Sequence, residues 1–196
     1  MTEDEFYHQL FSRLPAPSAD VAIPPGDDCA ALTTVEGGDL LLLAVDQLVG
    51  DMHYFTRGRS RATPEQAGRK LLARNLSDIA AMGGTPAHFL IALAYPTDAT
   101  EDWPNRFLSG VLELGRQFGM TMLGGDLTRT PNDEVTSLTI TGRVPADEVC
   151  RRSSAAAGDI LYATGSFGQS LPTGHHLSFT PRCREGRWLA AGGWTR

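Results

Sequence analysis

The stretch NLSDIAAMGG, residues 75–84, closes a long helical pattern and carries two polar side chains where apolar ones are expected. The helix is predicted to begin at Pro64, because proline is favoured in the first turn of a helix. It is predicted to end at about Met82, because the pair Gly83-Gly84 follows and glycine commonly stands just after a helix. The fold therefore depends on what this helix packs against and on why its buried face is interrupted.

A helical wheel places the two polar residues of this stretch against the apolar side of the helix. Asn75 falls inside the apolar sector, and Asp78 lies at its edge. A carboxylate beside a buried surface costs free energy unless it is paired or binds a metal ion. The helix alone leaves both explanations open for Asp78, either an ion pair with a neighbour such as Arg74 or a metal site. The apolar sector consists of Leu71, Leu72, Leu76, Ile79, Ala80 and Met82, and the opposite polar stripe of Gln66, Arg69, Lys70, Arg74 and Ser77.

Strands and helices alternate around this helix, which is the pattern of an α/β or α+β protein. A capping-box spacing from Thr2 to Glu5 predicts a first helix that Pro15 and Pro17 stop, and residues 18–38 are rich in loop signals. A second long helix is predicted at 103–118, and residues 47–62 read as an irregular connection. Strands are predicted at 40–45, ending at Asp46, at 89–95, at 120–123, closed by Gly124-Gly125-Asp126, at 135–144 and at 160–164.

The composition is that of an ordinary globular protein of 196 residues, with 41% hydrophobic and 20% charged residues. The net charge of −6 argues against a protein that binds nucleic acid by bulk attraction. Lys70 is the only lysine, so a fixed cationic contact to phosphate would come from arginine, a backbone N–H group, a helix terminus or a metal. Three widely spaced cysteines, an acidic N-terminus and the lack of an apolar run of about 18 residues favour a cytoplasmic protein without a membrane segment.

Aspartates also stand at the boundaries of other predicted elements. Asp27 and Asp28 lie in a tight loop, Asp46 ends a predicted strand, and Asp126 follows a glycine turn. Each alone is typical of a turn, but together with Asp78 they suit Mg²⁺, which binds carboxylate oxygens and is commonly shared with substrate phosphates. The sequence has no cluster of His and Cys of the kind that binds zinc, and no P-loop, dinucleotide-binding or nucleophile-elbow motif.

Five motifs occur in order along the chain: GDDCA (26–30), AVDQLVGDMHYF (44–55), ARNLSDIAAMGG (73–84), LGGDLTR (123–129) and RSSAAAGDILYATG (152–165). Together they resemble the thiamine-monophosphate kinase family. The resemblance covers about residues 20–168, and the family belongs to a superfamily with aminoimidazole ribonucleotide synthetase and selenophosphate synthetase. It implies a mixed sheet backed by helices, with two copies pairing their sheets into a barrel across a homodimer. It also implies that ATP phosphorylates thiamine monophosphate directly, without a covalent enzyme intermediate.

The resemblance also implies roles for particular residues. His53, which by itself reads as an isolated loop histidine, falls on the position that contacts thiamine monophosphate. Asp27 and Asn75 would support the site. The positions of the ATP contacts are Gly125, Asp126 and Arg152. The positions of the ligands to several Mg²⁺ ions are Asp28, Asp46, Asp78 and Asp126, together with backbone oxygens of Ala44 and Val45.

The family pattern is incomplete after about residue 170. Neither a D-[IV]-S-D-G motif nor a Gly-Gly-Glu-Asp motif occurs, although HHLSFTPRCREGRWLA (175–190) is similar to a later family segment. We therefore expect residues 1–150 to form an ATP- and Mg²⁺-binding dimerisation domain, and residues 151–196 a linker and the incomplete start of a second domain. Two alternatives stay open: another ATP-dependent synthetase of the superfamily, or a non-catalytic dimeric fragment that binds Mg²⁺ and nucleotide.

Overall fold

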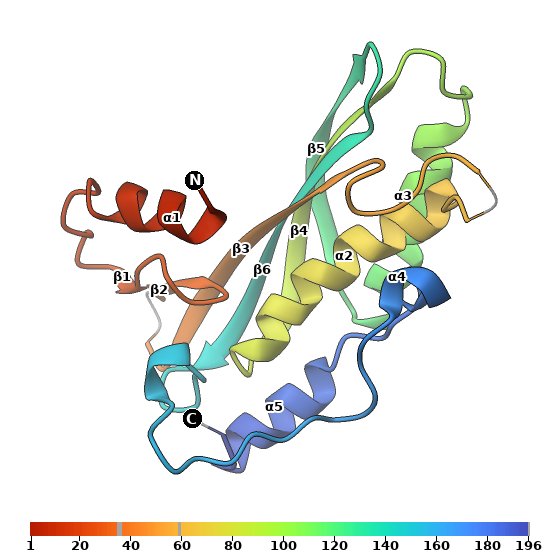
Figure 1. Ribbon diagram of the computed structural model, residues 1–196. Coiled ribbons are helices and arrows are strands. Elements are labelled where there is room, and N and C mark those ends of the chain that lie inside the picture. The colour runs from red at the N-terminus through yellow and green to blue at the C-terminus, as the bar shows by residue number, and fades with distance from the viewer. Residues whose placement is uncertain (35–36, 59, 196) are drawn as a thin grey trace.

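The computed structural model describes residues 1–34, 37–58 and 60–195. Its main feature is one mixed sheet with most of its helices on one side and the N-terminal helix on the other (Figure 1). The strand order is β1-β2-β3-β6-β4-β5; β4 and β5 are parallel and all other neighbours are antiparallel. The strands are β1 (Val21–Ile23), β2 (Ala30–Thr33), β3 (Asp39–Val49), β4 (Thr85–Pro96), β5 (Thr121–Thr130) and β6 (Val135–Pro145). The helices are α1 (Glu3–Phe11), α2 (Pro64–Ala81), α3 (Trp103–Gln117), α4 (Ser170–Thr173) and α5 (Cys183–Ala191), with 3-10 turns η1 (Arg152–Ser154) and η2 (His175–Leu177). The predicted mixed sheet backed by helices is confirmed, and the sheet is not closed.

The first two helices begin where their side chains satisfy the free backbone N–H groups of the first turn. In α1, the Glu5 backbone N–H donates to Thr2 Oγ1 at 3.2 Å, and the Glu5 carboxylate accepts from the Thr2 N–H at 2.8 Å. Thr63 and Gln66 form the same reciprocal pair at the start of α2. The predicted capping box at Thr2 and the predicted start at Pro64 are both confirmed.

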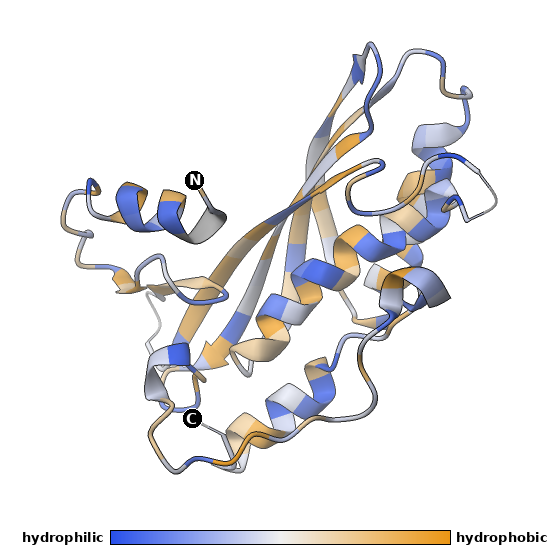
Figure 2. Ribbon diagram, in the orientation of Figure 1, coloured by the Kyte–Doolittle hydropathy of each residue, from blue (hydrophilic) through white to orange (hydrophobic). Residues whose placement is uncertain are grey.

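Helices α2 and α3 pack closely because glycines face each other where they touch. A Cβ on Gly68 would lie 2.1 Å from the backbone oxygen of Phe107, and one on Gly110 would lie 1.9 Å from that of Glu65. Four residues of the apolar sector of α2 are fully buried between α3 and the sheet, namely Leu71, Leu72, Leu76 and Ile79. Figure 2 shows the corresponding alternation of hydrophobic and hydrophilic residues along α2. This contact fixes the position of α2, which carries several candidate site residues.

The two faces of the sheet have different surroundings. In β6, the residues with even numbers, such as Leu138 and Ile140, are fully buried toward the helices, whereas the odd ones are partly or fully exposed. The register carries this alternation across the sheet, because directly paired residues point to the same face. Val45 and Leu90 therefore lie on the face opposite the helices, where they are 66% and 47% exposed. This open face carries both exposed apolar side chains and polar ones, and no other described element covers it near Leu90.

Strand β3 is longer than predicted, and this changes the place of Asp46. The strand was expected to end at Asp46, but it continues to Val49 and pairs with β6 along its whole length. Strand β2 pairs only with residues 40–43, so from Ala44 onward β3 has no paired strand on its other side among the residues that the structure describes. Asp46 interrupts the apolar run without ending the strand because it lies beside this free edge, where an arginine of α2 meets it.

Two further expectations for strands are wrong, and two short strands were not expected. Residues 120–123 were predicted as a short strand closed by a glycine turn, but β5 continues through Asp126 to Thr130 with a bulge at Leu123. The loop-rich residues 18–38 contain the short strands β1 and β2. Residues 160–164 form no strand; Leu161 is 98% exposed and has no strand beside it among the described residues.

The residues after 170 pack against α2 through α5 and the turn before it. The Cys183 thiol donates to the Leu76 carbonyl at 3.4 Å, and the Arg187 guanidinium donates to the Gly83 carbonyl at 3.2 Å. A Cβ on Gly186 would lie 2.3 Å from the Ala80 carbonyl oxygen, so α5 approaches α2 closely. Among the residues that the structure describes, no helix has the length and apolar character needed to cross a membrane.

Candidate functional site

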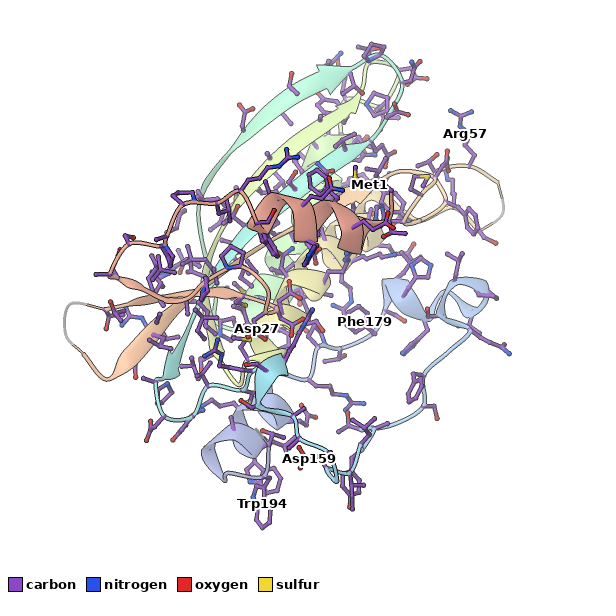
Figure 3. The ribbon with its side chains drawn as sticks, turned by 60° about the vertical axis from the view of Figure 1, so that its left-hand side comes forward. Met1, Asp27, Arg57, Asp159, Phe179 and Trp194 are labelled. Carbon is purple, nitrogen blue, oxygen red and sulfur yellow. The ribbon has the colours of Figure 1, made fainter. Side chains whose placement is uncertain are left out.

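Most of the predicted carboxylates surround one cavity of about 780 Å³ at the free edge of β3. The cavity wraps around this edge, since Asp46 and Val45, which point to opposite faces of the sheet, both line it. Helix α1 forms another wall with Tyr7 and Phe11. Figure 3 shows Asp27 beside this helix, near the short helix η1. The predicted residues at the cavity are Asp27, Asp28, Ala44, Val45, Asp46, Asp78 and Arg152.

Asp27 and Asp28 follow a sharp turn at Gly26, whose φ of 134° is accessible mainly to glycine. The Asp27 carboxylate accepts a hydrogen bond from the Arg152 backbone N–H at 2.9 Å and is nearly buried, with its side chain 6% exposed. Asp28 instead receives the Arg152 guanidinium at two oxygens, at 2.6 and 3.4 Å. Asp27 thus fixes the chain at η1, whereas Asp28 points a more exposed carboxylate at the cavity.

Asp46 pairs with an arginine of α2. Arg74 Nη2 lies 3.0 Å from Asp46 Oδ1, and the Asp46 side chain is 21% exposed. The ion pair that the helix pattern suggested between Arg74 and Asp78 is therefore made with Asp46 instead. Arg74 was not predicted as a site residue, because only the register of β3 against α2 brings it to Asp46.

Asp78 is the carboxylate with the most unfavourable surroundings. Burial, followed by the negative charges of Asp46 and Asp28, raises the pKa of Asp78 to about 7. Arg74 and Arg152 lower this pKa only in part. A partly buried carboxylate beside two others is the environment that a bound cation would relieve.

The donor chemistry of the cavity fits an oxygen-seeking cation such as Mg²⁺. Backbone carbonyls add to it, because successive carbonyls of a strand alternate in direction and either Ala44 or Val45 must point its own to the free edge of β3. In this arrangement, however, Arg74 and Arg152 occupy Asp46 and Asp28. Within the described ranges, no three His, Cys, Asp or Glu side chains stand close enough together to hold an ion.

Gly125 and Asp126 are not at this cavity. They lie on β5, the edge strand at the other side of the sheet, and Asp126 pairs with Ala92. Three strand spacings separate β5 from β3, which is about 14 Å. Asp126 is exposed and points to the open face, whereas Asp46 points to the helices. A single copy of the chain therefore does not bring Asp126 to Asp46 and Asp78.

His53 also lies away from the carboxylates, in the connection between β3 and α2. Its Nδ1 atom accepts a hydrogen bond from the Val49 backbone N–H at 2.9 Å. The next residue, Tyr54, is buried and donates its hydroxyl to Glu134 Oε2 at 2.6 Å. The irregular connection that was predicted at 47–62 is confirmed from Gly50 onward, although its conformation is fixed by these contacts.

The polar side chain of Asn75 lies on the buried face of α2 and hydrogen-bonds within its own helix. It is fully buried, and its side-chain amide donates to the Leu71 carbonyl at 2.9 Å, within its own helix. Its Oδ1 atom has no hydrogen-bond partner in the part of the chain that the structure describes. The observed contact of Asn75 is thus local to α2 and does not reach the cavity.

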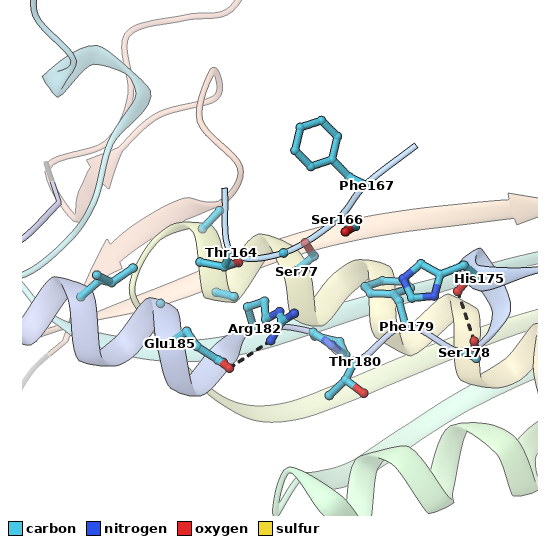
Figure 4. Close-up of a pocket in the computed structure, with 16 residues that line it drawn as sticks. Ser77, Thr164, Ser166, Phe167, His175, Ser178, Phe179, Thr180, Arg182 and Glu185 are labelled. Carbon is cyan, nitrogen blue, oxygen red and sulfur yellow. Dashed lines mark hydrogen bonds and ion pairs between the residues drawn. The ribbon is translucent and has the colours of Figure 1, made fainter. Parts of the chain in front are cut away.

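A second cavity of about 710 Å³ lies between α2 and the residues after 163 (Figure 4). Ser77 of α2 lines it together with Phe167, Phe179 and Arg182, and Arg182 is paired with Glu185 at 3.3 Å. None of the predicted site residues lies there. Arg69 of α2 contacts the lining of this cavity, because its guanidinium donates to the backbone carbonyls of Ser178 and Phe179 at 3.2 and 3.0 Å.

Comparison with known proteins places this geometry in a family context. Residues 26–144, more than half of the chain, match the family described as AIR synthase related protein, N-terminal domain. The chain is similar to the thiamine-monophosphate kinases of Bacillus subtilis, with 38% identity over 171 residues, and of Synechococcus elongatus, with 39% identity over 153 residues. These alignments include 87% and 78% of this chain but 51% and 45% of the relatives. The chain thus spans about half the length of the curated relatives it matches.

Solved structures agree on the fold. A structure described as AaThiL complexed with AMPPCP and TMP matches with a TM-score of 0.75 and 22% identity, over 95% of this chain and 60% of that one. The thiamine-monophosphate kinase of Stenotrophomonas maltophilia matches with a TM-score of 0.65 and 29% identity, over 96% and 63%. The region that matches the family, residues 26–144, begins at the turn that carries Asp27 and Asp28 and ends on β6, so it contains the strands from β2 onward, α2 and the carboxylates. The chain belongs to the AIR synthase related protein family and carries its N-terminal domain.

Proposed function

We propose that this chain acts in the ATP-dependent phosphorylation of thiamine monophosphate to thiamine diphosphate. The observation that carries the proposal is the set of three facing carboxylates, Asp28, Asp46 and Asp78, beside Arg152 at one cavity. It is supported by 38% identity to a thiamine-monophosphate kinase over 87% of the chain. The names of the similar curated proteins favour this activity over the competing synthetase activity of the same superfamily.

The two substrates carry phosphate groups that repel each other, so the site must neutralise charge and hold both reactants in line. Asp28, Asp46 and Asp78, with a backbone oxygen of Ala44 or Val45, would hold Mg²⁺, which supplies this neutralisation when bound. Arg152 would then release Asp28 and turn toward a phosphate of ATP, since its side chain is 66% exposed. His53 would donate to the phosphate of thiamine monophosphate. An acceptor that is already a phosphate oxygen requires no general base.

We also propose that the working unit is a homodimer paired through the open faces of two sheets. The exposed apolar residues of this face, including Val45 and Leu90, would be buried by a second copy. Such pairing would bring Asp126 and Gly125 of one copy, which point to the open face or lie beside it, toward the β3 edge of the other. A shared site would explain why one chain alone separates Asp126 from the other carboxylates.

The first test measures thiamine diphosphate by chromatography after incubation of the purified chain with thiamine monophosphate, ATP and MgCl₂. We expect product from the wild type and a loss of at least about 100-fold in Asp28→Asn, because a charged ligand and the partner of Arg152 are removed together. Asp147→Asn is the matched control, because Asp147 is exposed and does not line the cavity. Its rate should equal that of the wild type.

The second candidate function is binding of Mg²⁺ and nucleotide without turnover, and the observation that favours it is the position of Asp126 on β5, away from the carboxylate cavity of the same copy. The division into residues 1–150 and 151–196 belongs to this proposal too. Calorimetric titration with a non-hydrolysable ATP analogue separates the two functions. Mg²⁺-dependent binding without thiamine diphosphate formation would support the second function, and a folded chain that neither binds nor reacts would exclude both.

A further inference from the structure

We propose that Lys70 is the positioning residue for His53: its side chain holds the backbone of the His53 loop and thereby orients the imidazole toward an anionic substrate. The proposal rests on the proposed function only for the identity of that substrate, thiamine monophosphate. Neither the sequence motifs nor the carboxylate cavity gave Lys70 a role.

Lys70 is a buried cation with specific partners. It is 9% exposed, although the helical wheel placed it on the polar stripe of α2. Its Nζ atom donates to the backbone carbonyl of His53 and lies 2.9 Å from Nδ1 of His176. Burial, and then the charge of Arg74, lowers the pKa of Lys70 to about 8. The folded protein therefore destabilises the charged form of Lys70. A buried charge of this kind is usually retained where its contacts matter to the site around it.

Lys70 contacts a loop in which His53 also hydrogen-bonds to Val49, and these bonds leave one ring nitrogen of His53 free. The His53 N–H donates to the Val49 carbonyl at 3.0 Å, and Nδ1 of the ring accepts from the Val49 N–H. Nδ1 also lies 3.3 Å from the Val49 carbonyl oxygen, but its shorter contact is with the backbone N–H, which can only donate. This shorter contact favours the neutral tautomer that carries its proton on Nε2. This Nε2 has no hydrogen-bond partner within residues 1–34, 37–58 and 60–195. It is a fixed donor with the chemistry to meet a phosphate oxygen.

Helix α2 relates this loop to the carboxylates. Lys70, Arg74 and Asp78 follow one another at intervals of four residues, so they lie along one side of the helix. Lys70 meets the His53 loop, Arg74 meets Asp46, and Asp78 faces the cavity. The rise of a helix makes the span from Lys70 to Asp78 about 12 Å. The same rigid helix thus sets the distance between the fixed histidine and the carboxylates.

The test compares Lys70→Met, which keeps an unbranched side chain one atom shorter and removes the donor, with Lys70→Arg, which restores a cationic donor. Arg69→Met is the matched control, because Arg69 precedes Lys70 on α2 and contacts only the Ser178 and Phe179 carbonyls among its recorded partners. Calorimetry gives the Kd of thiamine monophosphate and, separately, of an ATP analogue with Mg²⁺. Long-range ¹H–¹⁵N NMR gives the tautomer of His53, identified by its absence in His53→Gln.

We expect Lys70→Met to weaken binding of thiamine monophosphate about tenfold, with the nucleotide Kd within twofold of the wild type. Lys70→Arg should recover part of the loss, and Arg69→Met should show none. Because Lys70 acts through His53, the double variant His53→Gln, Lys70→Met should bind no more weakly than His53→Gln alone. An unchanged Kd in Lys70→Met, or losses that add in the double variant, would overturn the proposal.

The NMR measurement separates this proposal from the proposed function. If the wild type binds no thiamine monophosphate, the proposed substrate is wrong, but the positioning role is still decided. A His53 ring that carries its proton on Nε2 in the wild type and becomes a mixture of tautomers in Lys70→Met supports the role. The same tautomer in both proteins contradicts it.

Discussion

At the scale of single residues, Asp78 couples the candidate site to the stability of the fold. Its pKa of about 7 lies above the ordinary value of 3.8, so the folded chain holds this proton more tightly than the unfolded chain does. Between about pH 4 and pH 7 the unfolded state therefore loses the proton first, and the stability due to this group falls as the pH rises. Above about pH 7, Asp78 is ionised in both the folded and the unfolded state, and it lowers the free energy of unfolding by an amount that no longer changes with pH. The same charge is what would attract a divalent cation.

We predict that Asp78→Asn stabilises the metal-free protein at pH 8 by roughly 1–2 kcal/mol, because it removes a carboxylate that Asp46 and Asp28 repel. This stability change is smaller than the free energy that corresponds to the full pKa shift, because Asp78 is partly exposed to solvent. At pH 4 the difference should vanish, since Asp78 is then protonated in the folded wild type. Urea unfolding at both pH values measures the effect.

Asp147→Asn serves as the control for this substitution, because Asp147 is exposed and outside the cavity. It should change neither measurement. MgCl₂ at pH 8 should stabilise the wild type and leave Asp78→Asn unaffected. An Asp78→Asn variant that is less stable than the wild type at pH 8 would show that the carboxylate is favourably placed without a cation.

The sequence identified the residues of the cavity better than their contacts. Asp28, Asp46 and Asp78 were selected because carboxylates at turns and on a buried helix face are unusual, and the fold brings them to one cavity. Their partners Arg74 and Arg152 lie 28 and 124 positions away along the chain. Such pairs depend on the register of distant elements, which no local pattern encodes. For the same reason, the burial of Lys70 by a loop and a distant segment was not predicted.

At the scale of elements, the crossing of α2 and α3 depends on two glycines that local propensity disfavours. We predict that Gly68→Ala lowers the free energy of unfolding by about 1–3 kcal/mol, although alanine is the better helix former. The added Cβ would meet the backbone oxygen of Phe107 at 2.1 Å, and a backbone atom cannot turn aside as a side chain can. Thermal unfolding followed by circular dichroism gives the difference.

Ser109→Ala on α3 is the matched control for the glycine substitution. Ser109 is exposed beside Gly110, and its hydroxyl contacts only the Asn105 carbonyl of its own helix among its recorded hydrogen bonds. Its melting temperature should stay within about 1 °C of the wild type, because surface changes of this kind have small effects. A Gly68→Ala protein that melts at or above the wild-type temperature would mean that the two helices separate at little cost.

Elements with strong periodicity were predicted closely, and those that depend on neighbours were not. The helix expected from Pro64 to about Met82 runs from Pro64 to Ala81, and the strand expected at 135–144 runs from Val135 to Pro145. In contrast, β3 and β5 continue through Asp46 and Asp126, because pairing with β6 and β4 outweighs a polar residue or a glycine pair. Residues 160–164 have the composition of a strand but no strand to pair with among the described residues.

At the scale of the whole molecule, the open face of the sheet carries exposed apolar side chains such as Val45 and Leu90, and the candidate site residues lie at two different edges of the sheet. Asp46 and Asp78 are reached from the β3 edge, whereas Asp126 lies on β5 about 14 Å away across the sheet. Apolar surface of this extent is costly in water, so pairing of two copies would stabilise the protein and bring the two edges together. The oligomeric state therefore bears on the proposed activity directly.

We predict that the wild type elutes as a dimer, with about twice the chain mass of 21.1 kDa by light scattering, and that Leu90→Lys shifts it to the monomer. Leu90 is 47% exposed at the centre of the open face, and a buried lysine without a partner would oppose pairing of the sheets. Leu112→Lys is the matched control, because Leu112 is 48% exposed but lies on α3, on the other side of the sheet. If Leu112→Lys dissociates the dimer and Leu90→Lys does not, the copies pair through the helices. In that case Asp126 cannot complete the carboxylate cavity of a second copy.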